Sequence, residues 1–229
     1  MPKVLFALTS HDRLGDTGRR TGFYVPEIAY PAEVFTAAGW DVGVVSVQGG
    51  EAPRDGVKEG DTVSAAFLAA YADELKNTPS ANQLDPADYD VIYFVGGHGT
   101  MWDFPGATDL AALTSAIYSR GGVVAAVCHG PAGLLSADLD DGSPIVQGKQ
   151  VAAFTNEEEA AVGLDDVVPF ALETALIEKG AKITKAENFA AHAVADGRLV
   201  TGQNPASATR SPSWPFSRPP RPDLLFFGG

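Results

Sequence analysis

The sequence predicts an α/β protein whose mostly parallel sheet carries helices on both faces. Short runs of apolar and β-branched residues recur along the chain, amphipathic segments separate them, and glycine or proline stands at most of the boundaries. A strand buried on both faces reads as a near-continuous apolar run, and the alternation of such strands with helices is typical of a parallel sheet. We therefore expect three layers, with the sheet in the middle.

The expected strands are short, apolar and followed by polar or glycine-containing turns. The pair Asp196-Gly197 is a hairpin signal, so the chain is expected to turn back there into the last strand. Strands are expected over residues 3–9, 41–47, 90–95, 123–127, 149–154, 181–185, 189–194 and 199–201.

The expected helices carry start and stop signals. Pro26 and Pro31 suit early helical positions, while Gly39 and Gly180 suit positions just past a helix end. Helices are expected over residues 26–38, 62–77, 109–120 and 166–179.

The composition limits the partners and the compartment. A formal net charge of −13 argues against binding to nucleic acid or to an anionic membrane surface. The single cysteine cannot form an internal disulfide, so nothing indicates an oxidising compartment. The apolar run at the N-terminus is too short for a signal peptide or a membrane span. A cytoplasmic location is therefore expected.

No internal repeat and no linker divides the chain, which predicts a single α/β domain over residues 1–209. The composition changes after it: from Ser211 the chain reads SPSWPFSRPPRPDLLFFGG. Prolines at this density exclude a regular helix, so residues 210–229 are expected to form an irregular tail. Its aromatic residues are available to pack on the domain or on a second subunit, which leaves a homodimer open.

The only cysteine lies in the stretch GGVVAAVCHGPAGLL, at residues 121–135. A buried strand ends in a turn at Cys128, His129 and Gly130, and Pro131 suits the first turn of a following helix. Ligands of open α/β sheets bind at such strand ends, and a helix N-terminus favours a thiolate. A lone cysteine is more often a small buried hydrophobe. The adjacent histidine and the glycines favour a nucleophile instead, as in the strand–nucleophile–helix turn of other α/β enzymes.

Other residues are candidates to act with this cysteine. His129 can serve as a general base if the turn brings the two adjacent side chains into one site. One of Glu157, Glu158 and Glu159 could orient the imidazole, although acids at a helix start are commonly solvated. Glu27 lies between apolar neighbours. If it is buried, its pKa is raised and it can exchange protons with a thiolate or a substrate; otherwise it is a solvated acid of a first helical turn.

A glycine-rich loop, GGHGTMWDF, follows the strand expected over 90–95. Gly96 and Gly97 allow backbone amides to approach a ligand, and with His98 they form a candidate substrate or oxyanion pocket. The loop lacks the lysine of a P-loop, and the first strand is not followed by G-x-G-x-x-G, which argues against nucleotide binding. The four histidines show no metal-ligand spacing, so no metal and no other cofactor is expected.

Four motifs occur in the order GGHGTMWDF, AAVCHGPAGL, FTNEEE and DGRLVTGQNPASA. They resemble the motifs of the ThiJ/PfpI superfamily, and the resemblance covers roughly residues 3–209. The resemblance implies the flavodoxin-like fold of class-I glutamine amidotransferases. The long glycine loop and the glutamate within FYVPEIAYP resemble the heat-shock chaperone branch, which includes the glutathione-independent glyoxalase III enzymes. One departure is that this family usually ends in an amphipathic helix after NPASA, where the proline-rich tail stands here.

The resemblance implies a role for each matching position. Cys128 matches the nucleophile, His129 the adjacent histidine and Glu27 the acid that contacts the cysteine. Glu159 matches the acid that orients the histidine, and Gly97 the residue whose amide contributes to the anion pocket.

The activity that the resemblance implies is a cofactor-independent glyoxalase III, a lyase also called D-lactate dehydratase. Cys128 would attack the aldehyde of a small dicarbonyl, methylglyoxal, to form a hemithioacetal. His129 or Glu27 would then move a proton between the two carbons, and water would release lactate. A stress-response holdase or a redox sensor with an oxidisable cysteine is the main alternative. A cysteine peptidase or amidase, or a deglycase, is a weaker one.

Overall fold

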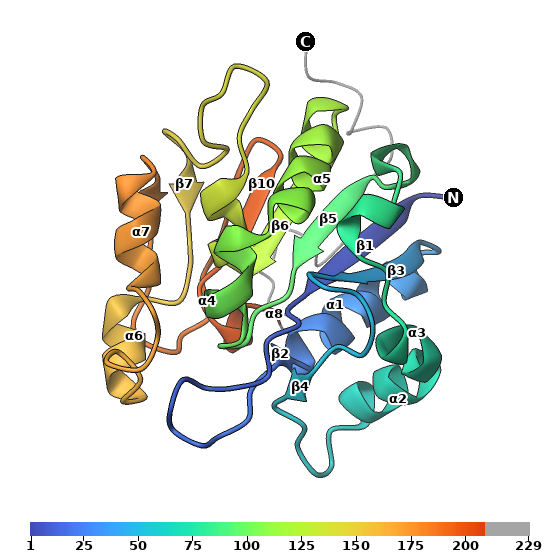
Figure 1. The fold of residues 1–229 in the computed structure, drawn as a ribbon, viewed down its shortest axis with the longest axis horizontal. Helices are drawn as coiled ribbons and strands as arrows, with labels where there is room; N and C mark the ends of the chain where they lie inside the picture. The colour runs from blue at the N-terminus through green and yellow to red at the C-terminus, as the bar shows by residue number, and fades with distance from the viewer. Residues whose placement is uncertain (209–229) are drawn as a thin grey trace.

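A six-stranded sheet forms the centre of the computed structural model, which describes residues 1–208 (Figure 1). Its strands follow the order β3-β1-β5-β6-β10-β9. The first five of these are parallel, and β9 is antiparallel to β10 across the expected hairpin turn. The strands of this sheet are β1 (Lys3–Leu8), β3 (Asp41–Ser46), β5 (Val91–Phe94), β6 (Val123–Val127), β9 (Ala193–Asp196) and β10 (Leu199–Gly202). Two small sheets pair β2 (Phe23–Tyr24) with β4 (Arg54–Asp55), and β7 (Gln150–Val151) with β8 (Lys182–Ile183).

The pleat of the strands divides the apolar core into two clusters, one on each face of the central sheet. Along β1, Phe6 belongs to one cluster and its neighbour Leu5 to the other, and along β5 Tyr93 and Ile92 divide in the same way. Successive side chains of a strand point to opposite faces, and all four of these are completely buried. The central strands are therefore covered on both sides, as their continuous apolar sequences predict.

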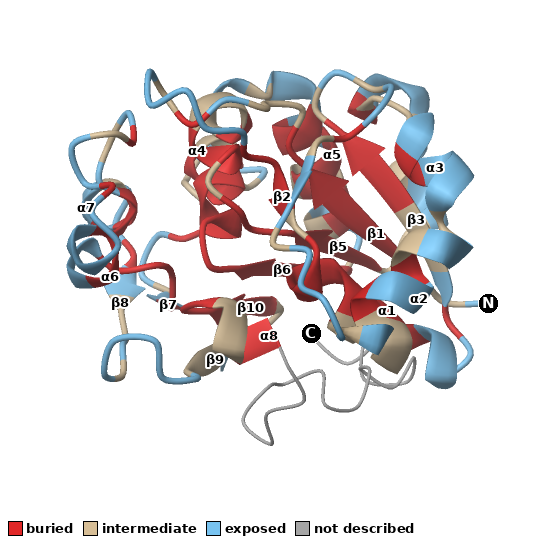
Figure 2. Ribbon diagram, turned by 90° about the horizontal axis from the view of Figure 1, so that it is seen from below, coloured by how far each residue is buried: buried red, intermediate tan, exposed pale blue. Residues whose placement is uncertain are grey.

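Helices cover both faces of this sheet. Residues of α1, α2 and α8 contribute to one core cluster, and residues of α5, α7 and the 3-10 helix η4 to the other. Figure 2 shows the buried strands as a layer between α4 and α5 on one side and α1 and α8 on the other. The predicted three-layer α/β architecture is confirmed. The α-helices are α1 (Pro26–Ala37), α2 (Thr62–Ala70), α3 (Ala72–Lys76), α4 (Thr100–Asp103), α5 (Thr108–Ser119), α6 (Asn156–Ala161), α7 (Leu172–Glu178) and α8 (Pro205–Ala208). The 3-10 helices are η1 (Ala81–Gln83), η2 (Pro86–Asp88), η3 (Phe104–Gly106) and η4 (Gly130–Ser136).

Some segments differ from the expectation. Of the strand expected over 149–154 only β7 forms, and it pairs outside the central sheet because β9 occupies the edge beside β10. The helix expected over 62–77 is interrupted at Tyr71, whose φ of −111° and ψ of 24° are not helical. The strand expected over 189–194 begins later, at β9. Each error lies at the periphery, where apolar pattern alone does not decide which strand or helix a segment joins.

The parallel strands bring their carboxyl ends to one edge of the sheet, where open α/β sheets bind ligands. β5 leads into Gly96 and Gly97, and the neighbouring β6 leads into Cys128. Within residues 1–208, no helix is both long and apolar enough to span a membrane. The tail expected over 210–229 lies outside the described residues.

Gly130→Ala is predicted to destabilise this fold. A methyl group at Gly130 would lie 2.3 Å from the carbonyl oxygen of Phe94, in the neighbouring strand β5, so the backbone would have to shift. Overpacking of this kind costs about 2 kcal/mol of unfolding free energy, which urea unfolding followed by circular dichroism measures. Gly106→Ala is the matched control, because no atom lies within 4 Å of the added methyl group there. Equal stability of the two variants would show that β5 and η4 are packed less tightly than described.

Candidate active site

Cys128 occupies a sharp turn between β6 and η4. Its φ of 59° lies in the left-handed region, which costs a residue with a side chain about 1–3 kcal/mol. Two backbone hydrogen bonds hold the turn: the Cys128 N–H donates to the Gly202 carbonyl at 2.9 Å, and the Phe154 N–H donates to the Cys128 carbonyl at 2.9 Å. The strained residue is therefore held from both sides, in the sharp turn between a strand and a helix that the sequence predicts.

Glycines allow other segments to approach this turn closely. A methyl group at Gly96 would lie 2.4 Å from Oε2 of Glu27 and 2.9 Å from Cβ of Cys128. A methyl group at Gly97, whose φ is 107°, would lie 2.2 Å from the Gly22 carbonyl oxygen. Both positions therefore require glycine, and the first of them brings the loop after β5 into contact with the thiol and the carboxyl.

His129 lies beside the thiol although the two residues are adjacent in sequence. Its Nδ1 is 3.3 Å from Sγ of Cys128, and its Nε2 is 2.6 Å from Oε2 of Glu159. Because an ionised carboxylate only accepts hydrogen bonds, this network assigns the ring proton to Nε2 and leaves Nδ1 unprotonated. The lone pair of Nδ1 therefore faces the thiol and can accept its proton.

Glu159 orients two imidazole rings. Its Oε1 accepts a hydrogen bond from Nε2 of His98 at 2.9 Å, while Oε2 accepts from His129. Burial raises the pKa of Glu159, but the hydrogen bonds from His129 and His98 outweigh burial and hold the pKa at about 2. Burial, followed by the neighbouring His98, lowers the pKa of His129 to about 4. Near neutral pH, an ionised carboxylate therefore faces a neutral His129 ring.

Glu27 is completely buried in the first turn of α1. Burial raises its pKa to about 8, while the Cys128 thiol and the Gly96 amide, which face the carboxyl, act in the opposite direction. Neither carboxyl oxygen makes a hydrogen bond of good geometry among the described residues. Of the two alternatives for Glu27, the buried acid is correct. Near neutral pH it is a neutral group with a proton to donate.

The resting thiol is harder to ionise than the sequence suggests. Burial, and then negative charge on Glu27, raise the pKa of Cys128. The His129 backbone N–H acts in the direction expected of a helix start, but its effect is smaller. Two acidic groups in contact inside a buried site do not both ionise, so the thiol and the carboxyl titrate as a coupled pair. The expectation of a readily formed thiolate is wrong for the resting site, and a base must remove the proton during any reaction.

The loop after β5 supplies backbone donors. The N–H groups of Gly97 and His98 make no hydrogen bond among the described residues, and both residues line a cavity that reaches Cys128. Donors of this kind can stabilise a developing oxyanion. Gly96 lies against Glu27 instead and does not line the cavity.

The cavity that reaches the thiol has a volume of about 320 Å³. This lies at the lower end of the volumes of ligand pockets, so a small substrate fits. Phe189, which is 48% exposed and has a φ of 62°, forms part of the wall. The remaining walls are mostly aromatic and aliphatic, with one charged residue of each sign: Arg19, Tyr24, Asp55, Phe154, Val162, Leu164 and Pro205.

Glu158 has a structural role that the sequence analysis missed. One oxygen of this completely buried carboxyl accepts hydrogen bonds from the Phe189 N–H at 2.7 Å, Asn204 Nδ2 at 2.8 Å and Gln203 Nε2 at 3.0 Å. With Thr155 it forms a capping box at the start of α6, which the Thr-x-x-Glu spacing could have indicated. Glu158 thereby ties the cavity wall to the helix that carries Glu159. Of the three consecutive acids, only Glu157 is exposed.

His98, His129 and Glu159 also form a group that could hold a metal ion, because their donor atoms lie within 4.8 Å of one another. Two imidazoles and a carboxylate are ligands that suit Zn²⁺. The spacing along the chain does not indicate this group, since its members come from three separate segments. Hydrogen bonds between the three side chains already account for their proximity.

Comparison with known proteins places the chain among sequences of similar length. The DJ-1/PfpI family matches residues 21–210. Glyoxalase 3 of Candida albicans is 36% identical over 92% of this chain and 95% of its own length. The glutathione-independent glyoxalase HSP31 of Saccharomyces cerevisiae is 36% identical over 90% of this chain and 93% of its own.

Solved structures show the same relationship. The crystal structure of glyoxalase III from Candida albicans matches with a TM-score of 0.84 at 33% identity, covering 91% of this chain and 93% of that one. Rapid Encystment Protein 24 KDa of Francisella tularensis matches with a TM-score of 0.87 at 39% identity, covering 91% and 95%. The resemblance carried by the four sequence motifs is confirmed: the chain belongs to the DJ-1/PfpI family, and enzymes named as glutathione-independent glyoxalases are among its relatives.

Proposed function

We propose that this protein is a glutathione-independent glyoxalase of the glyoxalase III type, a lyase that converts methylglyoxal to D-lactate. One observation carries the proposal: a buried thiol faces an unprotonated imidazole nitrogen at 3.3 Å and also a carboxyl that is neutral near neutral pH. These are the groups that addition to an aldehyde and proton transfer between two carbons require. The names of the relatives support the same reaction class.

In the first step, the sulfur of Cys128 attacks the aldehyde carbon. Nδ1 of His129 takes the thiol proton as the C–S bond forms, and Glu159 stabilises the resulting imidazolium. The π electrons of the carbonyl move onto oxygen, where the N–H groups of Gly97 and His98 are the proposed donors. The imidazolium then gives its proton to this oxygen, which leaves a neutral hemithioacetal and a neutral His129.

In the second step, His129 removes the proton from the carbon that carries the sulfur. The electron pair forms a carbon–carbon double bond, and the former ketone oxygen takes the proton of Glu27, which gives an enediol. The Glu27 carboxylate then recovers a proton from the hydroxyl on the sulfur-bearing carbon. At the same time the imidazolium protonates the other carbon. The product is the thioester of lactate with Cys128, and both protein groups return to their resting states.

In the third step, water hydrolyses the thioester. Neutral His129 removes a proton from the water that attacks the thioester carbon, and the sulfur of Cys128 leaves with the bonding electrons. The imidazolium then returns this proton to the sulfur, and lactate leaves as the acid. Methylglyoxal and one water yield one lactate, with no net oxidation or reduction.

The burial of the cysteine favours this proposal over a redox sensor. Cys128 is 4% exposed and its pKa is raised, whereas cysteines that sense oxidants are exposed and ionised. The holdase, deglycase and peptidase alternatives differ from this proposal in whether methylglyoxal is turned into lactate. The first experiment below measures that conversion directly.

Cys128→Ser is predicted to abolish lactate formation from methylglyoxal in the absence of glutathione. A hydroxyl is a much weaker nucleophile than a thiol beside a neutral imidazole, so kcat/KM should fall about 1,000-fold or more. An assay of lactate measures the rate, and urea unfolding checks that the variant is folded. Full activity of the variant would rule out the thiol mechanism. Negligible turnover by the wild type, with suppression of client aggregation that survives the substitution, would favour a holdase.

Glu27→Gln is predicted to change the pH dependence of stability. The folded-state pKa of about 8 lies above the ordinary value of 4.5, so the contribution of Glu27 to stability is fully present below about pH 4.5 and is lost as the pH rises through about 8. Between about pH 5 and pH 8, the wild type should lose about 3 kcal/mol of unfolding free energy relative to the variant. Urea unfolding at the two pH values measures the difference, with Glu33→Gln on the same helix as the control.

The same substitution should reduce activity, because an amide cannot donate and recover a proton. We expect kcat to fall about 100-fold. We also expect the wild-type rate to decline above about pH 8, where Glu27 ionises, and a pH–rate profile measures this. A variant with an unchanged rate would remove Glu27 from the mechanism, whatever its effect on stability.

A further inference from the structure

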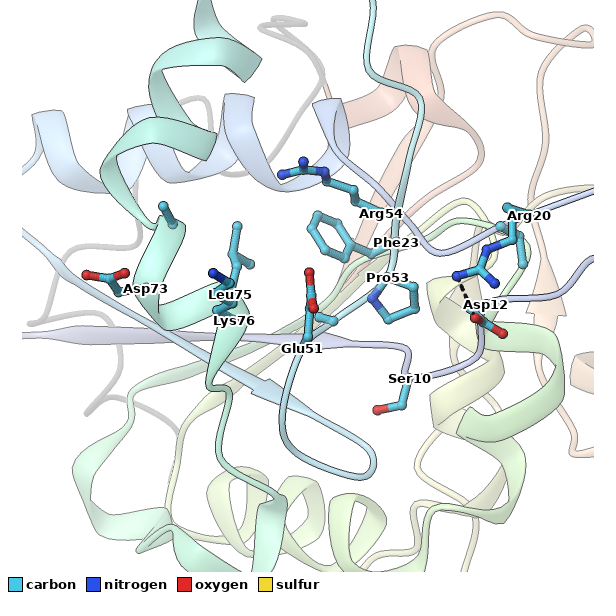
Figure 3. A pocket seen from close by; sticks show the side chains of 13 residues that line it. Ser10, Asp12, Arg20, Phe23, Glu51, Pro53, Arg54, Asp73, Leu75 and Lys76 are labelled. Atoms are coloured by element: carbon cyan, nitrogen blue, oxygen red, sulfur yellow. Dashed lines mark ion pairs between the residues drawn. The ribbon is translucent and has the colours of Figure 1, made fainter.

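A second cavity, of about 620 Å³, lies on the other side of the ribbon formed by β2 and β4 (Figure 3). The ribbon pairs Phe23 with Arg54, and Tyr24 with Asp55. Because side chains alternate along a strand, the two pairs face opposite ways. The lining residues agree: Phe23 and Arg54 line the second cavity, whereas Tyr24 and Asp55 line the cavity that reaches Cys128.

The second cavity has an apolar floor. Phe23, Ala52 and Leu75 line it and are buried, and the ring of Pro53 lies beside them. In Figure 3, the Phe23 ring lies between Arg54 and Glu51, and Pro53 lies between Glu51 and the ion pair of Asp12 with Arg20. The volume is within the range of small-molecule sites. Pro53, which is half-buried, is the apolar residue of the floor that leaves surface for a ligand.

The rim of the second cavity carries charges of both signs in equal number. The cations are Arg20, Arg54 and Lys76, and the anions are Asp12, Glu51 and Asp73. Asp12 and Arg20 form an ion pair at 2.8 Å. The side chains of the other four make no hydrogen bond or ion pair among residues 1–208, so two cations and two anions are available to a ligand.

This balance selects a ligand that itself carries both charges. A polyanion such as a nucleotide would meet the carboxylates, and a polycation would meet the basic groups. A carboxylate can pair with Arg54 or Lys76 and an ammonium group with Glu51 or Asp73, while an apolar side chain packs on the half-buried ring of Pro53. We propose that the second cavity is a binding site for zwitterionic peptides of about two residues with an apolar side chain.

The ribbon connects this site to the loop beside Cys128. The Tyr24 N–H donates to the Gly96 carbonyl at 2.9 Å. The contact of Gly97 with the Gly22 carbonyl leaves no room for even a methyl group. A ligand that shifts the ribbon therefore shifts the Gly96–Gly97 loop as well. Binding in the second cavity then changes the position of Gly97 in the wall of the first cavity.

Titration of the full, ¹⁵N-labelled chain with glycyl-leucine, followed by two-dimensional NMR, tests this site. Exposed charges contribute little each, so we expect saturable shifts with a dissociation constant of about 1 mM. The amide resonances of Leu75 and Gly97 should both move. Arg54→Gln and Asp73→Asn should each weaken binding about threefold, whereas Arg120→Gln, an exposed arginine away from the cavity, should not. N-acetyl-glycyl-leucinamide has the same side chain and no charges, and it should bind about tenfold more weakly.

The site would be overturned if no saturable shift appeared up to about 20 mM peptide, which is well above the dissociation constant expected for contacts of this strength. Equal affinity for the charged and the blocked peptide would also overturn it. So would variants Arg54→Gln and Asp73→Asn that bind the peptide as tightly as Arg120→Gln does. Shifts confined to the second cavity, with an unchanged Gly97 resonance, would overturn the connection to the first. None of these results depends on whether the protein turns over methylglyoxal.

Discussion

The left-handed turn at Cys128 is the constraint on which the rest of the site depends. Adjacent side chains on a regular strand or helix diverge, so the thiol and the His129 ring share one cavity only because the backbone reverses between them. The φ of 59° is held by hydrogen bonds to Gly202 at the end of β10 and to Phe154 after β7. Parallel pairing of β5, β6 and β10 supplies the neighbours that stabilise the turn. Sheet topology, rather than any single side chain, therefore creates the site.

The buried site carries little net charge in its resting state. Among Cys128, Glu27, His129 and Glu159, only Glu159 is ionised near neutral pH, and two imidazole rings hydrogen-bond to it. A second negative charge, on the thiol or on Glu27, would be buried beside the first without a counterion. A reaction in this site is therefore best served by protons passed between neutral groups, with charge formed only transiently beside Glu159. Glu27 gains catalytic potential from the same burial that makes its ionised form destabilising.

The central strands could be predicted because a strand that is buried on both faces has a continuous apolar sequence. The turn at Cys128 and the required glycines could also be predicted, because Gly-Gly or Cys-His-Gly directly after a buried strand indicates a sharp turn at the strand end. The family resemblance pointed to Glu159 as the acid that orients His129, but the hydrogen bond from His98 to the same carboxylate could not be predicted, because the three side chains come from segments that meet only in the folded sheet. The same limit explains why the raised pKa of the Cys128 thiol could not be predicted. The effect of the helix start is local in sequence, whereas burial and the charge of Glu27 depend on the tertiary structure. Among the acids after Phe154, only a capping box distinguishes buried Glu158 from exposed Glu157.

Conversion of methylglyoxal in D₂O without glutathione tests the proposed chemistry most directly. His129 lines a cavity open to solvent, so a proton that it carries between the two carbons exchanges with the medium. The enediol route therefore predicts lactate that bears deuterium on the carbon with the hydroxyl group, as NMR of the product shows. Lactate with only protium at that carbon, which a hydride shift would give, or the absence of lactate altogether, would contradict it.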